Sequence, residues 1–140
     1  MQISELMTNR VISVRQSETA DVAARLLSRN NIGAMPVVDD SGTVVGMLTD
    51  RDLVVRCMAA GFRPQEVPIA QIMTSGPVVA QEDEDVEIVS ARMGYAQVRR
   101  IPVVRNGALT GIVSLADLAR QHRDRTVETL EEISRNVSRR

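Results

Sequence analysis

Two stretches of the chain decide its fold: Gly46-Met47-Leu48-Thr49-Asp50-Arg51-Asp52-Leu53, and its copy Gly111-Ile112-Val113-Ser114-Leu115-Ala116-Asp117-Leu118. The copy begins 65 positions after the original (111 − 46) and keeps its order of apolar, hydroxyl and acidic residues. A chain that repeats itself at a fixed period is built from copies of one supersecondary unit. The 140 residues therefore predict two equivalent halves.

The repetition extends towards the N-terminal side of each stretch. Leu6-Met7-Thr8 returns as Ile72-Met73-Thr74, and Met35-Pro36-Val37-Val38 returns as Ile101-Pro102-Val103-Val104. These segments are 66 positions apart (73 − 7 and 102 − 36), so the second copy lacks one residue before its Gly-led stretch. The missing residue falls in the turn at Asp39–Gly42, because loop tips change length more readily than strands do.

The composition is that of an ordinary globular protein. Hydrophobic residues make up 44% of the chain, which is enough to build a core at this length. Aromatic residues are almost absent, so the stacking platforms that hold single-stranded nucleic acid are missing. A net charge of −1 also lacks the basic excess of a nucleic-acid surface. We expect no nucleic-acid partner.

Targeting signals are also missing from the sequence. No segment approaches the roughly 18 apolar residues that a membrane-spanning helix needs, and Met1–Glu5 lacks the features of a signal peptide. The single cysteine, Cys57, stands in an apolar run, which predicts a small buried side chain. We expect a cytoplasmic protein without membrane contact.

Each copy follows one plan of strand, helix, strand, strand and helix. β-Branched segments, helix-start signals at residues 17–19 and 83–85, and turn residues at each hairpin support this plan. Asn106-Gly107 is a strong signal for a two-residue hairpin turn. The first copy predicts strands at 11–14, 35–38 and 44–48, and helices from 17–19 to about 30 and from 52 to 61. The second copy predicts strands at 78–79, 101–104 and 109–113.

The boundaries follow from this plan and from two prolines at positions 64 and 68. We predict repeat 1 at residues 1–62, a linker at 63–70, repeat 2 at 71–120 and a helical tail at 121–140. Two such small repeats should pack their sheets face to face with the helices outside. The tail carries a narrow apolar stripe, formed by Val127, Leu130, Ile133 or Ser134, and Val137. The tail can lie back on its own domain or contribute to a dimer interface.

Each Gly-led stretch places a hydroxyl and a carboxylate three residues apart where a strand passes into a helix. The pairs are Thr49 with Asp52, and Ser114 with Asp117. A carboxylate beyond a strand end can accept hydrogen bonds from two neighbouring hydroxyls, which suits the cis-diol of a ribose. The same spacing also forms a helix capping box, which needs no ligand. Binding is favoured because both copies keep the pair in the same sequence context.

These combined motifs resemble the tandem CBS domains, a family named after the regulatory region of cystathionine beta-synthase. The resemblance covers Ile3 to about Arg120, and the stretches 31–36, 46–56 and 59–61 are similar to the small stand-alone bacterial CBS pairs. The resemblance implies the α+β fold of a CBS-domain pair. It also implies a homodimer formed through the helical faces.

The resemblance further implies a regulatory or sensor module and not an enzyme. CBS pairs bind adenosine-containing ligands such as AMP, ADP, ATP or S-adenosylmethionine in clefts between the repeats, and they require no cofactor. By this analogy Thr49 and Asp52 hold the ribose in one cleft, and Ser114 and Asp117 hold it in the other. The adenine pockets would be lined by Val11, Ile12, Val78 and Val79.

Phosphate groups need positive charge, which the family tends to place just before the Pro-Val strand. The second copy has Arg99-Arg100 there, whereas the first has Gly33-Ala34. We therefore expect one site with good phosphate neutralisation and a second that is weak or takes a ligand with less phosphate. The alternative for Arg99 and Arg100 is a solvated pair, and Arg51 is either a further phosphate ligand or an exposed helical side chain.

Other chemistry has little support in the sequence. His122 has no neighbour at metal-ligand spacing, so we expect neither a metal site nor acid-base catalysis. The acidic run Asp83-Glu84-Asp85 is explained by a helix start. Two alternatives to a sensor stay open: a ligand-free dimerisation or partner-binding module, and a nucleotide-hydrolysing enzyme. The sequence identifies no effector protein.

Overall fold

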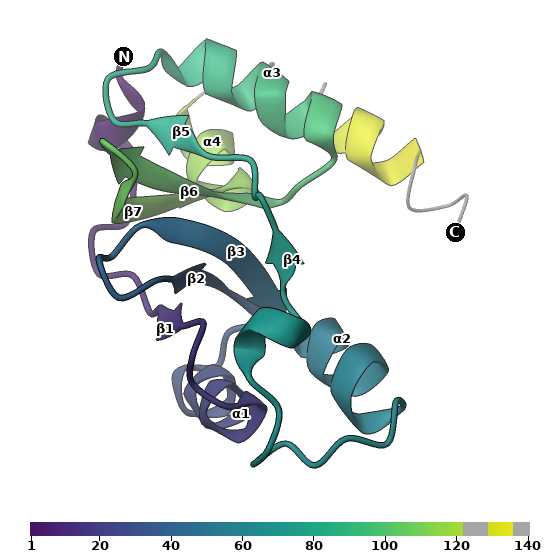
Figure 1. Ribbon diagram of the computed structural model, residues 1–140. Coiled ribbons are helices and arrows are strands. Elements are labelled where there is room, and N and C mark those ends of the chain that lie inside the picture. The colour runs from purple at the N-terminus through teal and green to yellow at the C-terminus, as the bar shows by residue number, and fades with distance from the viewer. Residues whose placement is uncertain (122–128, 136–140) are drawn as a thin grey trace. The chain divides into compact units, whose positions relative to one another are not determined.

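The computed structural model describes residues 1–121 and 129–135, which divide into two compact units (Figure 1). The first-repeat unit comprises Val11–Pro77 and Gly107–Leu109. The second-repeat unit comprises Met1–Arg10, Val78–Asn106 and the described residues from Thr110 onward. Each unit contains one copy of the repeated pattern.

The first-repeat unit is built on a sheet with the strand order β1-β2-β3-β4. β1 (Val14–Arg15) runs parallel to β2 (Ala34–Val38), and α1 (Ala20–Asn30) connects them. β3 (Val44–Thr49) pairs antiparallel with β2 on one side and with β4 (Thr74–Ser75) on the other. The predicted hairpin of residues 35–48 is confirmed.

Helical turns follow β3 directly. α2 (Asp50–Asp52) continues into the π-helix η2 (Leu53–Met58), and Gly61 closes the turn with a φ of +82°. The wider winding is recorded in the hydrogen bond from the Ala59 N–H to the Val54 carbonyl, five residues back. The helix predicted from residue 52 to 61 is thus confirmed as far as Met58, and residues 59–61 form a turn.

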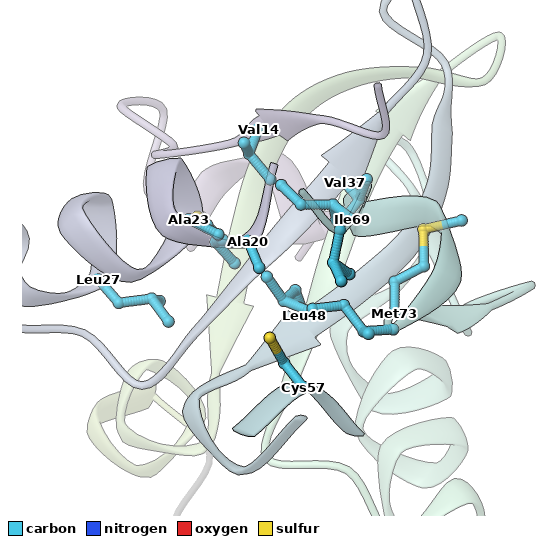
Figure 2. Packing of buried hydrophobic residues seen from close by; sticks show 12 residues of the cluster. Val14, Ala20, Ala23, Leu27, Val37, Leu48, Cys57, Ile69 and Met73 are labelled. Carbon is cyan, nitrogen blue, oxygen red and sulfur yellow. The ribbon is translucent and has the colours of Figure 1, made fainter. Parts of the chain in front are cut away.

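The core of this unit lies between α1, η2 and the sheet. Figure 2 shows side chains of α1 meeting those of the central strands and of η2. Cys57 is 1% exposed and packs as a small apolar side chain, as the sequence predicts. The labelled cluster contains Val14, Ala20, Ala23, Leu27, Val37, Leu48, Cys57, Ile69 and Met73.

The second-repeat unit repeats this arrangement with a three-stranded sheet in the order β5-β6-β7. β5 (Ala80–Gln81) runs parallel to β6 (Arg100–Arg105), and α3 (Val86–Ala96) connects them. β7 (Ala108–Ser114) is followed by α4 (Leu115–Gln121). The core side chains come from each of these elements and from Ile3.

Turn and cap residues explain where the elements begin and end. Asn106 (φ 51°) and Gly107 (φ 85°) form the predicted two-residue hairpin turn, which needs two left-handed residues. α1 and α3 begin after Thr19 and Asp85, at the predicted start signals. The carboxylate of Asp85 accepts a hydrogen bond of 2.8 Å from the Glu87 N–H and so caps α3.

The two repeats exchange their leading segments. In the second-repeat unit, η1 (Ile3–Glu5) is held by the hydrogen bond from the Ile3 N–H to the Glu84 carbonyl, 2.8 Å long. In the first-repeat unit, η3 (Ile69–Gln71) is held by the equivalent bond from the Ile69 N–H to the Glu18 carbonyl, also 2.8 Å. Ile3 and Ile69 are both fully buried. The second core is therefore completed by Ile3 of the predicted repeat 1, and the first core by Ile69, which lies at the end of the predicted linker just before repeat 2.

The first strand of each copy begins later in the chain than predicted, at 14 instead of 11 and at 80 instead of 78. β1 starts at Val14 and β5 starts at Ala80, so the predicted strand residues Val11, Ile12, Val78 and Val79 precede them as half-buried, irregular backbone. A segment is a strand only where a neighbouring strand pairs with it. Of residues 11–15, only Val14 and Arg15 pair with β2, and in the second copy Ala80 and Gln81 pair with β6.

The described part of the predicted tail is helical. Residues 129–135 lie on α3 in the second-repeat unit (Figure 1), with Thr129 and Ile133 each 3% exposed and Leu130 43% exposed. The Thr129 and Ser90 hydroxyl oxygens are 3.2 Å apart. This part of the tail thus lies back on its own chain. The predicted stripe residues Val127 and Val137 lie outside the described residues.

Candidate ligand site

The first hydroxyl–carboxylate pair forms a closed cap at the junction of β3 and α2. The Thr49 N–H donates to Oδ2 of Asp52 over 2.9 Å, and the Asp52 N–H donates to Oγ1 of Thr49 over 3.0 Å. The second carboxylate oxygen, Oδ1, lies 3.8 Å from Nε of Arg56. The Asp52 side chain is 12% exposed.

The second pair repeats this geometry at the junction of β7 and α4. Oδ2 of Asp117 accepts hydrogen bonds from the Ser114 N–H (2.8 Å) and from the Ser114 hydroxyl (3.0 Å). Oδ1 of Asp117 accepts a hydrogen bond of 2.6 Å from Arg120, whose side chain is 69% exposed. The Asp117 side chain is also 12% exposed.

Both pairs are therefore capping boxes, and this explains why a hydroxyl and an acid recur at this spacing. The cap uses one oxygen of each carboxylate. The other oxygen is held by a solvent-facing arginine, which is a contact that an entering hydroxyl group can replace at small cost. Capping and ligand binding are compatible at these two positions.

The residues before the Pro-Val strands lie beside these junctions. The Asp50 N–H donates to the Gly33 carbonyl (2.9 Å), and the Leu115 N–H donates to the Arg99 carbonyl (3.0 Å). Gly33 and Arg99 thus occupy equivalent places, each next to a junction.

The charge at those places differs. A Cβ at Gly33 would lie 3.4 Å from Oδ2 of Asp50, so the first junction carries an acid near this position. At the second junction, Arg99 and Arg100 are exposed and form no ion pair within residues 1–121 and 129–135. The equivalent places beside the two junctions therefore differ in charge, with Asp50 near the first and Arg99 and Arg100 at the second.

The segments predicted to line adenine pockets have irregular backbone. No backbone hydrogen bond holds Val11, Ile12 or Val78 among the described residues. Val79 is held from the side, because its carbonyl accepts a hydrogen bond of 2.9 Å from Arg92 of α3. Free backbone groups on half-buried residues are suited to pair with the edge of a base.

Arg92 is a positioning residue that sequence reasoning missed. Besides the Val79 carbonyl it binds both carboxylate oxygens of Glu84, over 2.8 and 2.5 Å. The hydrogen bonds from Arg92 lower the pKa of Glu84, and Glu84 in turn raises the pKa of Arg92. One feature of the sequence could have pointed to Arg92. It is a charged residue in the middle of a predicted helix, and the equivalent residue of the first copy, Leu26, is apolar.

Arg56, beside the first junction, is a second positioning residue that the sequence analysis did not single out. Its guanidinium donates to the carbonyls of Met73 (3.1 Å) and Ile72 (3.4 Å) in addition to its ion pair with Asp52. It thereby links the junction to the segment that leads into β4. Its spacing from Asp52 within a predicted helix was the signal.

The predicted site residues divide between the two units. The first-repeat unit contains Val11, Ile12, Thr49 and Asp52. The second-repeat unit contains Val78, Val79, Arg99, Arg100, Ser114 and Asp117.

Residues 1–121 and 129–135 lack two kinds of structural feature. These residues contain no group of three or more His, Cys, Asp or Glu side chains placed to hold a metal ion. No helix in the same residues has the length and apolar character needed to cross a bilayer. His122 lies outside the described residues.

The fold and the junctions define an α+β protein made of two equivalent repeats, each with an acid and a hydroxyl at a strand-to-helix boundary. The family model of the CBS domain matches residues 3–58 and 69–124. The chain belongs to the CBS domain family, which confirms the resemblance seen in its motifs.

Relatives of similar length support the assignment. Protein YlbB of Bacillus subtilis is 40% identical over 141 residues, which cover 99% of this chain and 95% of YlbB. Hypoxic response protein 1 of Mycobacterium tuberculosis, a relative of the stand-alone kind, is 34% identical over 116 residues, covering 83% and 81% of the two chains.

Solved structures share the fold. Hypoxic Response Protein I, crystallised with two coordinated zinc ions, has a TM-score of 0.80 at 32% identity, covering 86% of this chain and 98% of its own. The CBS domain pair of protein MJ0100, in complex with 5-methylthioadenosine and S-adenosyl-L-methionine, has a TM-score of 0.73 at 28% identity and covers 86% and 94%. CBSX2 in complex with AMP has a TM-score of 0.74 at 26% identity and covers 88% and 96%.

Proposed function

We propose that this protein is a regulatory module that binds an adenosine-containing ligand at its strand-to-helix junctions. The observation that carries the proposal is the repeated geometry of Asp52 and Asp117. Each carboxylate has one oxygen fixed by its helix cap, while the other is held only by a surface arginine. A ribose diol can replace that arginine and pair with the free oxygen.

The ligands of two related structures support this assignment. The MJ0100 domain pair was crystallised with 5-methylthioadenosine and S-adenosyl-L-methionine, and CBSX2 was crystallised with AMP. All three molecules contain adenosine and differ in what is attached to the 5′ carbon. The shared part fits a carboxylate that receives the ribose, with Val11, Ile12, Val78 and Val79 contributing to recognition of the base.

The charge at each junction sets the preference for the 5′ group. Arg99 and Arg100 stand next to Ser114 and Asp117, so we expect a phosphorylated ligand such as AMP, ADP or ATP there. Asp50 takes the corresponding place beside Thr49 and Asp52, which disfavours phosphate. The first junction therefore suits an adenosine ligand with little or no phosphate.

Regulation would follow from a shift between conformations of the protein when the ligand binds one of them better. No catalytic role is proposed for any residue, because helix capping accounts for the contacts of the hydroxyl and the carboxylate at each junction, including the hydrogen bond from the Ser114 hydroxyl to Asp117. The protein that receives the signal would be a separate effector.

A homodimer is part of the proposal. The outer face of η2 and the turn after it expose three large apolar side chains, Val55 (47%), Met58 (71%) and Phe62 (51%). Adjacent exposed apolar side chains of this size are typical of protein interfaces. We expect a second copy to cover them.

The alternative function is a dimerisation or partner-binding module without a ligand. The observation that favours it is the capping box itself, because the cap accounts for Thr49, Asp52, Ser114 and Asp117 without any ligand. The two functions differ in whether the loss of a carboxylate changes affinity as well as stability.

Thermal-shift and calorimetric titrations distinguish the ligand-binding module from the ligand-free module. The purified protein is titrated with AMP, ADP, ATP, S-adenosylmethionine and adenosine, alongside the double variant Asp52→Ala, Asp117→Ala. A ligand at about 100 times its dissociation constant adds about 2.7 kcal/mol of apparent stability. We expect a raised melting temperature in the natural sequence and none in the double variant.

The matched control is Asp85→Ala, which removes a helix-capping carboxylate at a third position. Each lost cap should cost about 1 kcal/mol in every variant. Only the junction variants should lose affinity. A flat response of the natural sequence to all five compounds would instead support the ligand-free module.

A further inference from the structure

Arg56 joins two parts of the first-repeat unit that are far apart in the sequence. Its Nε lies 3.8 Å from Oδ1 of Asp52 at the first junction. Its Nη1 donates to the Met73 carbonyl over 3.1 Å and to the Ile72 carbonyl over 3.4 Å. One guanidinium thus contacts both the junction and the β4 segment, residues 72–75. Arg56 lies in the π-helix η2, and short π-helical segments occur frequently at functional sites.

The contact between Arg56 and Asp52 uses the carboxylate oxygen that a ligand would need. The helix cap takes the other oxygen, Oδ2, through the hydrogen bond of 2.9 Å from the Thr49 N–H. An entering ribose hydroxyl and Arg56 would therefore compete for Oδ1. The Asp52 side chain is 12% exposed and that of Arg56 is 50% exposed, so the arginine is the partner that has room to move. Once a ligand takes Oδ1, the guanidinium loses the carboxylate that holds it over the two carbonyls.

The hold of Arg56 on these carbonyls matters because the β4 segment has few other attachments. β4 has two residues, at the edge of its sheet, and Thr74 pairs with Met47 of β3. A peptide group is planar, so a fixed Met73 carbonyl also fixes the Thr74 N–H that follows it. A short edge strand of this kind opens locally at low cost when one contact is lost. Directly after it, the chain passes at Val78 into the second-repeat unit.

The second junction is built differently. Position 121 corresponds to Arg56 at the spacing of the Gly-led stretches (121 − 56 = 65), and it holds the uncharged Gln121. The arginine at this junction is Arg120, which is 69% exposed and donates to Oδ1 of Asp117. A charged link from the junction carboxylate to a segment distant in the sequence is therefore a property of the first repeat.

We propose that Arg56 couples ligand binding at the first junction to the stability of the β4 segment. An adenosine ligand draws Asp52 away from Arg56, and the β4 segment loosens where the chain leaves the first-repeat unit. This inference rests on the proposed function, because it needs a ligand hydroxyl at Oδ1 of Asp52. The coupling is reciprocal, so the β4 segment opposes ligand binding by the same factor.

Hydrogen exchange of the Met73 and Thr74 amides, followed by NMR with and without saturating adenosine, tests the coupling. All proteins are full-length and carry Asp117→Ala, which confines adenosine to the first junction. Arg56→Met removes the link, and it should fold because methionine is a good helix former. The matched control is Arg25→Met, which breaks another ion pair between residues four apart, with Asp21 on α1, where Arg25 is 61% exposed. Circular dichroism checks the fold of each variant.

In the Asp117→Ala protein and with Arg25→Met, adenosine should speed the exchange of both amides by roughly 1.4- to 5-fold, the factor that corresponds to an exposed ion pair. With Arg56→Met, exchange should be faster already without adenosine, and adenosine should add nothing. Calorimetric affinity for adenosine should rise by the same factor, roughly 1.4- to 5-fold, in this variant. A purely structural role of Arg56 would speed exchange in the variant without any response to adenosine in the other two proteins.

The outcomes that overturn the coupling differ from those that overturn the proposed function. If adenosine binds but exchange at Met73 and Thr74 is unchanged or slower, the coupling is wrong and the proposed function stands. The same holds if adenosine speeds exchange equally with Arg56→Met, because the ligand would then reach the β4 segment without Arg56. If adenosine does not bind, or binds equally after Asp52→Ala, both proposals are wrong.

Discussion

Met73 packs its sulfur against the backbone of Gly46, in the space that any larger residue would need. A Cβ at position 46 would lie 2.5 Å from Sδ of Met73 and 2.9 Å from the carbonyl oxygen of Thr74. Met7 and Gly111 repeat this contact in the second-repeat unit. The glycine that opens each Gly-led stretch is thus explained by the Met-Thr segment that the other copy supplies.

Gly46→Ala should destabilise the protein by about 1–3 kcal/mol, the usual cost of overpacking a well-packed site. The methionine side chain can move, but the Thr74 carbonyl belongs to β4 and cannot move without disturbing its pairing with β3. Urea unfolding monitored by circular dichroism measures the loss. Measured in a Met73→Ala background, Gly46→Ala should cost less but still destabilise, because the contact with the Thr74 carbonyl persists. No cost in that background would show that the sulfur alone sets the requirement for glycine.

Gly94→Ala should not destabilise the protein, in contrast to Gly46→Ala. The closest atom to a Cβ at this position is Oε2 of Glu132, at the end of a flexible side chain, and Gly94 lies inside α3. Alanine is about 1 kcal/mol better than glycine in a helix interior. We expect equal or higher stability in thermal unfolding. A loss of more than about 1 kcal/mol would mean that Glu132 is held rigidly against α3.

The ion pair between Glu84 and Arg92 should make stability fall in acid. The pKa of Glu84 is lowered in the folded protein, so the pair stabilises fully above the ordinary glutamate pKa of about 4.3. Its contribution is lost as pH falls from there through the lower pKa of the folded state. In Arg92→Met, the drop in melting temperature between pH 7 and pH 3 should be smaller than in the natural sequence.

Arg105→Met is the control for this measurement. Arg105 pairs with Glu82 over 2.7 Å and also lowers the pKa of that carboxyl, but the Arg105 side chain is 71% exposed, so water screens the pair. The pH dependence of stability should therefore change less in this variant than in Arg92→Met. Equal changes in both variants would indicate a general effect of net charge.

Arg120→Met should raise the affinity of the second junction for adenosine. Arg120 donates to Oδ1 of Asp117, the oxygen that the proposed ribose contact would use, and so it competes with the ligand. Exposed pairs of this kind contribute about 0.2–1 kcal/mol, which corresponds to a gain of roughly 1.4- to 5-fold in affinity. Calorimetric titration with adenosine measures the change, and weaker binding would show that Arg120 contacts the ligand directly.

Much of the fold could be predicted because each element has a local signal. Thr19 and Asp85 mark helix starts, Asn106-Gly107 marks a hairpin turn, and the repeated Pro-Val segments become the buried strands β2 and β6. These signals depend on the chain within a few residues of the element. The repeat itself also predicted the family.

The parts of the fold and of the site that could not be predicted depend on contacts between residues far apart in the sequence. The exchange of leading segments leaves no local trace, since Ile3 and Ile69 are equally apolar wherever they pack. Arg56 and Arg92 were missed because their partners are carbonyl groups that only the folded chain brings near. At the site, the sequence already indicates the capping box as an alternative to ligand binding. Only the folded structure shows that the cap uses one carboxylate oxygen and leaves the other to an arginine.

The exchange also sets an order for folding during synthesis. Apart from Gly107–Leu109, the first-repeat unit is complete once Pro77 has left the ribosome, because its own late segment around Ile69 is then available. Met1–Arg10 must wait, with Ile3 and Met7 uncovered, until β7 has been made. Residues 1–10 are therefore made before both sheets but pack after them, and Ile3 and Met7 stay exposed on the nascent chain until then.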